Sequence, residues 1–151
     1  MGTTRSAAVI SAGMRRVHGR DTGIEVKIRK ALWRSGLRFR LHVRRLPGVP
    51  DVVFPRSKIA LFIDGDFWHG NQWRLRGLPS LEQQFTGCAN REYWIRKITR
   101  NAERDRDNDA KLRALGWRVI RVWESEAKQD FEGCIQRIVE KVRLPGGEDI
   151  R

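Results

Sequence analysis

The apolar run Ile59-Ala60-Leu61-Phe62-Ile63 decides the fold class of this chain. A strand without polar alternation is typical of the centre of a sheet that is covered on both faces. Working outward, Asp51-Val52-Val53-Phe54 predicts a short second strand opened by Pro50, and residues 117–123 (WRVIRVW) predict another. Helices lie between these segments, so we expect an α/β chain folded as a three-layer sandwich with a central mixed sheet.

The segments around these strands carry helical or alternating patterns. Residues 22–35 predict a helix, with a capping box formed by Thr22 and Glu25. Residues 37–43 (LRFRLHV) alternate between apolar and basic side chains and predict a strand with one buried face. Two more helices are expected at residues 91–115 and 127–142, with an apolar stripe in each.

The remaining segments have no regular pattern. We expect residues 1–20 to be a flexible basic arm, residues 21–143 to be the folded domain and residues 144–151 to be a loose tail. Residues 64–90 form a long connection rich in Gly, Trp and Arg, and a connection of that length in a small domain is usually functional or disordered.

The charge of the chain predicts a polyanionic partner. Its 31 Lys and Arg residues exceed its 18 Asp and Glu residues, which gives a formal net charge of +13. Nucleic acid fits this excess, because neutralising phosphates releases counterions. An acidic membrane surface is the rival, but no apolar stretch is long enough to span a bilayer. Cys88 and Cys134 form neither a disulfide framework nor a complete zinc site, which favours a reducing, cytoplasmic setting.

Four side chains could carry hydrolytic chemistry. Asp51 and Asp64 stand at or just past apolar segments, and carboxylates at strand ends are well placed to hold a divalent metal. His69 could take a proton from an attacking water, and Glu25 could hold a metal-bound water or orient the histidine. Each has a plainer interpretation, since the aspartates suit turns, Glu25 suits the capping box and His69 suits an ordinary polar surface. We interpret His18 and His42 as surface residues.

The order of several blocks resembles one known family. The blocks are DTGIE at 21–25, LPGVPD at 46–51, IDGDFWHG at 63–70, YWIRKI at 93–98, ERD at 103–105 and GWRV at 116–119, with VWE at 122–124. Together they are similar to the very short patch repair (Vsr) DNA mismatch endonucleases over about residues 11–126. The resemblance implies a restriction-endonuclease-like fold related to the PD-(D/E)XK enzymes. It also implies nicking of one DNA strand beside a T·G mismatch, which starts repair of deaminated 5-methylcytosine.

The resemblance assigns roles to the candidate site residues. It implies Mg²⁺, with Mn²⁺ as a candidate substitute, bound by Asp51 and by the main-chain carbonyl of Ile63. It makes His69 the catalytic histidine and places Glu25 in the same active site. Two further aspartates are candidates with less defined roles: Asp64, a third candidate metal ligand at a position where some members have histidine, and Asp105, which would orient His69.

The resemblance also predicts the DNA contacts. Phe67, Trp68 and Trp94 correspond to an aromatic wedge that opens the base stack, a step that is cheapest where pairing is poor. The arm residues Met14, Arg15 and Arg16 would reach the other groove. Lys97, Arg100 and Arg104 lie at helical spacing and could meet phosphates. The alternatives are that the tryptophans fill core and that the three cations form a solvated basic face.

The chain departs from the family at its zinc site. Many members hold a structural zinc through cysteines, and the corresponding positions here are Asp66, Asn71, Trp73 and Ser125. We therefore expect no structural zinc. The segment 71–92 also looks longer than in familiar members, which leaves the target open.

Three functions are compatible with these patterns. The first is a T·G mismatch nickase, the second is a nickase or endonuclease with another DNA target in restriction or phage defence, and the third is a non-catalytic DNA-binding module. In each case we expect a bacterial-type, nucleoid-associated monomer on double-stranded DNA. Repair or methyltransferase-linked partners stay open.

Overall fold

A four-stranded mixed sheet forms the centre of the protein, and the computed structural model describes residues 22–144 around it. The strands follow the order β1 (Arg40–Leu41), β2 (Val52–Phe54), β3 (Ile59–Asp64) and β4 (Arg118–Trp123). The first three pair in antiparallel fashion, whereas β3 and β4 are parallel from the pair Ile59 and Arg118 to the pair Asp64 and Trp123. The predicted mixed sheet is therefore confirmed.

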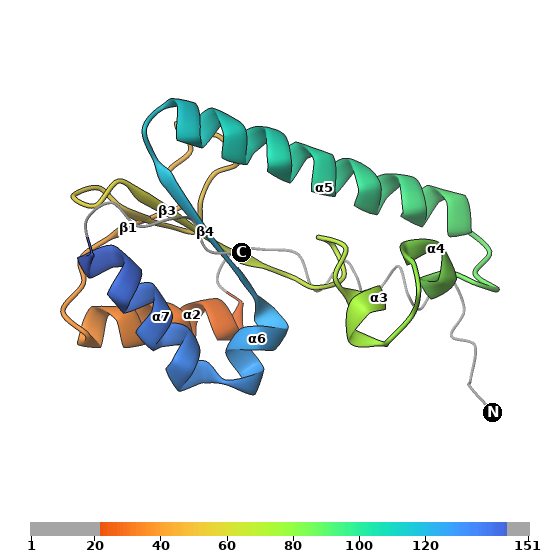
Figure 1. The fold of residues 1–151 in the computed structure, drawn as a ribbon, viewed down its shortest axis with the longest axis horizontal. Coiled ribbons are helices and arrows are strands. Elements are labelled where there is room, and N and C mark those ends of the chain that lie inside the picture. The colour runs from red at the N-terminus through yellow and green to blue at the C-terminus, as the bar shows by residue number, and fades with distance from the viewer. Residues whose placement is uncertain (1–21, 145–151) are drawn as a thin grey trace.

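Helices cover both faces of this sheet, as Figure 1 shows. One face carries α2 (Gly23–Arg34), α6 (Glu124–Gln129) and α7 (Phe131–Arg143), and the other carries the 24-residue α5 (Arg91–Ala114). The predicted three-layer sandwich is confirmed. Helix α2 begins with the predicted capping box, in which the Thr22 and Glu25 side chains each accept a hydrogen bond from the backbone N–H of the other residue.

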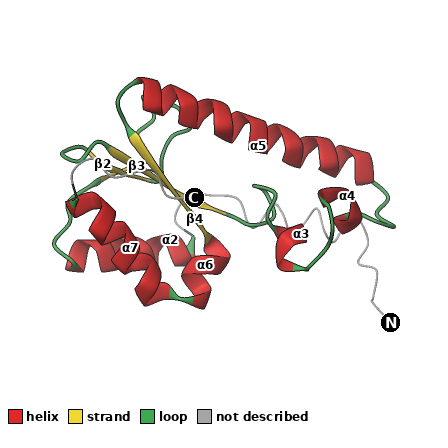
Figure 2. Cartoon of the chain, viewed as in Figure 1, coloured by secondary structure: helices red, strands yellow, loops and turns green. Residues whose placement is uncertain are grey.

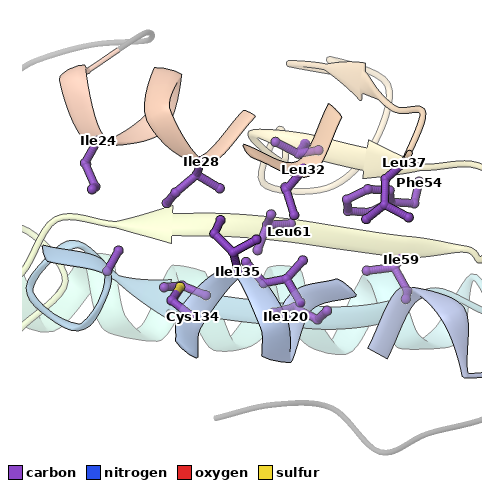
Figure 3. Close-up of a cluster of buried hydrophobic side chains, with 14 residues drawn as sticks. Ile24, Ile28, Leu32, Leu37, Phe54, Ile59, Leu61, Ile120, Cys134 and Ile135 are labelled. Carbon is purple, nitrogen blue, oxygen red and sulfur yellow. The ribbon is translucent and has the colours of Figure 1, made fainter. Parts of the chain in front are cut away.

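Alternate side chains of β3 enter two different hydrophobic cores. Leu61 lies in the core between the sheet and α2, α6 and α7, where Ile28 and Ile135 pack near it (Figure 3). Ala60 and Phe62 face the other way and pack with Leu112 of α5. The apolar run at 59–63 is thus buried on both faces, because each face of the sheet has its own layer of helices.

The long connection after β3 is ordered and contains two short helices, α3 (Gln72–Leu75) and α4 (Leu81–Gln84) (Figure 2). It packs against the first half of α5 through a third cluster, in which Phe85, Trp94 and Ile98 are buried. The connection therefore extends the domain beyond the end of the sheet (Figure 1).

Two predicted elements differ in the structure. The strand expected over 37–43 shrinks to the two residues of β1, since it pairs on one side only and His42 turns into the left-handed region with φ 47°. The helix expected over 127–142 is two helices, because Asp130 interrupts it and its side chain caps α7 by accepting from Gly133 N.

The arm at 1–20, with Met14, Arg15 and Arg16, lies outside the described residues, as does all of the tail except Leu144. Within 22–144, none of the helices is long and apolar enough to cross a bilayer.

The burial of β3 generates a stability prediction. Leu61→Ala removes a fully buried side chain and should lower the free energy of unfolding by about 2–5 kcal/mol. Leu75→Ala, at a side chain that is 57% exposed, is the matched control and should change it by less than about 0.5 kcal/mol. Urea unfolding of both variants measures the difference, and equal midpoints would contradict the central position of β3.

Candidate active site

A tight turn delivers Asp51 to the start of β2. Gly48 lies in the left-handed region at φ 76°, and a Cβ placed there would meet Asn108 and Phe62 at 3.2 Å. The glycine lets the loop approach α5 and β3 closely before β2 begins at Val52. The Asp51 carboxylate then crosses to the neighbouring strand, where its Oδ2 accepts from the Ile63 backbone N–H at 2.7 Å.

Glu25 lies against Asp51 from the first turn of α2. Its side chain is buried, at 4% exposure, although one of its oxygens also accepts from the Thr22 backbone N–H at 3.1 Å. The capping interpretation and the active-site interpretation of Glu25 are therefore compatible. Burial of Asp51, together with its hydrogen bond and charge repulsion with Glu25, raises the pKa of Asp51 to about 8. Without a cation, this carboxylate pair holds a proton near neutral pH.

His42 is a residue that the sequence interpretation missed. It is half-buried, and one of its ring nitrogens lies within 4.8 Å of carboxylate oxygens of Glu25 and Asp51. Its backbone N–H donates to the Asp51 carbonyl at 3.3 Å, so the pairing of β1 with β2 brings it there. The interpretation of His42 as a simple surface residue was wrong.

His69 follows β3 at the end of a short turn and faces α5. Its Nδ1 lies 2.5 Å from Oδ2 of Asp105, and its Nε2 lies 3.8 Å from Oδ1 of Asp64. Burial acts to raise the pKa of Asp105, but the hydrogen bond and charge of His69 and the charge of Arg121 outweigh it and lower that pKa. Asp105 is thus an ionised partner that orients the imidazole ring.

Arg121, in the middle of β4, is a second residue that the sequence interpretation missed. Its guanidinium is buried and forms hydrogen bonds with Asp64 and with Asp109 of α5. An arginine flanked by apolar residues in the middle of a strand was the available signal, because a buried cation needs carboxylate partners. The strand pattern alone does not tell which aspartates these are.

The predicted catalytic residues lie around one cavity of about 550 Å³. Its lining includes Glu25, Asp51, Ile63, Asp64, His69 and Asp105. The structure thus brings Asp51 and His69 together from separate segments. Glu124 also lines the cavity, and burial raises the pKa of its carboxyl group.

Comparisons with known proteins place this chain in a family. The family model described as DNA mismatch endonuclease Vsr matches residues 4–75. The Type II nicking enzyme V.NmeDIP of Neisseria meningitidis serogroup C is 36% identical over 124 residues, which cover 82% of this chain and 79% of that protein. The chain belongs to the Vsr endonuclease family.

Two other Vsr-type relatives agree with this assignment. The Type II nicking enzyme V.XorIIP of Xanthomonas oryzae pv. oryzae is 42% identical over 113 residues, covering 75% of this chain and 77% of that protein. The DNA mismatch endonuclease Vsr of Escherichia coli K12 is 37% identical over 124 residues, covering 82% and 74%. The predicted restriction-endonuclease-like fold and the predicted DNA-nicking endonuclease class are confirmed by this membership.

The predicted wedge residues of the Vsr resemblance lie in one aromatic cluster. Phe67 contacts both tryptophans edge-on, with ring centroids 5.3 Å from Trp68 and 5.5 Å from Trp94. Trp94 is only 8% exposed and stacks on Phe85, so it supports the cluster from inside. Trp68 is half-buried and also lines the active-site cavity.

The three predicted phosphate-binding cations share one surface groove on α5. Lys97, Arg100 and Arg104 line it together with Tyr93, Arg96 and Asn101. Lys97 and Arg104 also line the active-site cavity, so this basic groove adjoins the cavity of the predicted catalytic residues.

Hydrogen bonds join three of the four positions that the resemblance equates with zinc-binding cysteines, namely Asp66, Asn71 and Ser125. Asp66 Oδ1 accepts from the Asn71 side-chain amide at 2.8 Å and from the Ser125 hydroxyl at 2.7 Å. Asp66 Oδ2 accepts from the Ser125 backbone N–H at 3.0 Å. The Asp66 carboxylate therefore ties the turn that carries His69 to the start of α6.

The raised pKa of Asp51 generates a pH prediction for the metal-free protein. A folded-state pKa of about 8, against the ordinary 3.8, means that this group stabilises the fold below pH 3.8 and that the contribution is lost as the pH rises toward 8. In EDTA, the melting temperature of the wild type should fall more between about pH 5 and about pH 8 than that of Asp51→Asn. Parallel melting curves for the two proteins would contradict the buried carboxylate pair.

Proposed function

We propose that this protein nicks one strand of double-stranded DNA beside a T·G mismatch, in a reaction that depends on Mg²⁺ bound at Asp51. The observation that carries the proposal is the single cavity shared by Asp51, Glu25 and His69. The relative from Escherichia coli is named a DNA mismatch endonuclease, which supports the mismatch target. Metal-assisted hydrolysis uses a cation bound at the phosphate and a base that takes a proton from the attacking water. This cavity offers groups for both.

The oxygen atoms at Asp51 fit Mg²⁺. Mg²⁺ prefers hard oxygen ligands. The candidates here are the carboxylates of Asp51 and Glu25 and the main-chain carbonyl of Ile63. Their crowding supports a cation site as well, because a positive charge offsets the burial and the repulsion from Glu25 that both raise the pKa of Asp51. When bound, Mg²⁺ would activate a water molecule and offset the charge that builds on the phosphate.

His69 is the proposed general base. The short contact of its Nδ1 with Asp105 favours the tautomer that carries the proton on Nδ1. This leaves Nε2 to accept a proton on the side of the cavity. The turn after β3 holds this nitrogen in place, since the His69 backbone N–H donates to the Gly65 carbonyl at 3.2 Å.

The surface next to the cavity supports a DNA-binding role. The basic groove on α5 suits a phosphate backbone, because contacts with phosphates fix the register of a duplex without reading its sequence. Trp68 lies beside this groove, with Lys97 Nζ 5.9 Å from its ring centroid. We propose that Trp68 and Phe67 insert at the mismatch, where unstacking costs least.

A nickase with another DNA target is the second candidate. Phe85, from the long connection, stacks on Trp94 with an interplanar angle of 9°, so residues outside the quoted family blocks help to shape the proposed wedge. The relatives from Neisseria and Xanthomonas are named nicking enzymes, without mention of a mismatch. These observations favour a DNA target other than the T·G mismatch as the second candidate.

A nicking assay with Mg²⁺ on matched and T·G duplexes tests the proposal. The wild type should cut the T·G duplex faster. Asp51→Asn should lower the rate by roughly 10³-fold or more because it removes the cation site, and His69→Ala should lower it by about 10²–10⁴-fold because it removes the base. Both variants should keep DNA binding, since the basic groove is unchanged.

Equal rates on the two duplexes would favour the second candidate. Unchanged cutting by Asp51→Asn would contradict the cation site. Absence of cutting on every duplex, by the wild type and the variants alike, would leave a DNA-binding module.

Trp68→Ala tests the wedge. It should reduce the preference for the T·G duplex more than it reduces total affinity, because wedging depends on local pairing while phosphate contacts do not. Trp33→Ala is the matched control, since that side chain is 50% exposed on α2, away from the groove. A uniform loss of affinity on all duplexes would instead identify Trp68 as a core residue.

A further inference from the structure

The charge arrangement around Arg121 is unusual for the inside of a sheet. Arg121 is 5% exposed and lies opposite Phe62 in the pairing of β3 with β4, with its Cζ 4.1 Å from the Phe62 ring centroid. A guanidinium in such a place loses its water and must recover that free energy from fixed partners.

Three carboxylates surround this guanidinium. Nη1 donates to both oxygens of Asp64 at 3.0 Å, while Nε and Nη2 donate to Asp109 at 2.7–3.0 Å. Oδ1 of Asp105 lies 3.9 Å from Nη2. Burial acts to lower the pKa of Arg121, but the hydrogen bond with Asp109 and the charges of the three aspartates outweigh it and raise that pKa, so the cation is permanent.

Two of these carboxylates flank the proposed base. Asp105 lies at Nδ1 of His69 and Asp64 lies 3.8 Å from its Nε2. The ligand atoms of Asp64, His69 and Asp105 lie within 4.8 Å of one another, a set that by composition alone could hold a divalent ion. The guanidinium, however, already supplies the positive charge at this group, and both oxygens of Asp64 are bound to it.

We propose that Arg121 is a built-in cation that keeps metal out of the Asp64–His69–Asp105 group and holds the two aspartates in place around His69. Asp64 is then a positioning residue for His69 and not a ligand of the metal at Asp51. A divalent ion in this group would meet a positive charge that is held in place, because Asp109 anchors the far side of the guanidinium. This inference rests on the proposed metal site at Asp51.

Mn²⁺ binding, followed by electron paramagnetic resonance in the presence of a duplex with a non-hydrolysable linkage, tests the inference in the full chain. Asp64→Asn should weaken Mn²⁺ binding by less than about tenfold, the range of a neighbouring charge, whereas Asp51→Asn should weaken it by more than about a hundredfold. A loss of tenfold or more in Asp64→Asn would overturn the proposal. No uptake by the wild type would instead contradict the proposed function.

A second pair of variants tests the built-in cation directly. Arg121→Gln should bind a second Mn²⁺ per chain, because it frees the Asp64 carboxylate beside His69, and adding Asp64→Asn should restore one Mn²⁺ per chain. A purely structural role for Arg121 would not change this ratio, so one Mn²⁺ per chain in folded Arg121→Gln would overturn the proposal. If melting curves show that Arg121→Gln does not fold, the Asp64→Asn comparison decides by itself.

Discussion

The parallel pairing of β3 with β4 is the constraint on which the rest of the structure depends. It runs over six residue pairs, is buried on both faces and joins segments far apart in the sequence. Its register sets Arg121 opposite Phe62 and brings the end of β3 to the start of α6. A shift by one residue would turn the Arg121 guanidinium to the other face of the sheet, away from α5 and its aspartates. The same pairing therefore fixes the core and the charge arrangement of the active site.

The proposed catalytic groups reach this frame from different elements. Asp51 comes from a turn with a left-handed glycine, Glu25 from the first turn of a helix and His69 from the turn after β3. Glu25 and Asp51 are each held by a backbone N–H, and His69 is held by the Asp105 carboxylate on α5. Because the elements that carry them pack on one sheet, the hydrophobic cores set their relative positions.

Much of this arrangement could be predicted from local patterns. The run at 59–63 indicated a doubly covered strand, and Asp51 and His69 were proposed from residue types near apolar segments and from family resemblance. His42 and Arg121 were missed, because local sequence patterns do not show which carboxylates the folded sheet and α5 bring to them. The length of the strand at 37–43 and the helix break at Asp130 were mispredicted for another reason. Edge pairing shortens the strand and capping interrupts the helix, and both override an otherwise good periodic pattern.

The hydrogen bonds of the Asp66 carboxylate determine how the turn that carries His69 responds to oxidation. The turn that carries His69 is joined to α6 by hydrogen bonds that form as the chain folds, with Ser125 and Asn71 as donors. Such a junction needs no delivery of a transition metal during synthesis. Peroxide has no sulfur atom to attack among these three side chains. The turn should therefore keep its shape under oxidative stress.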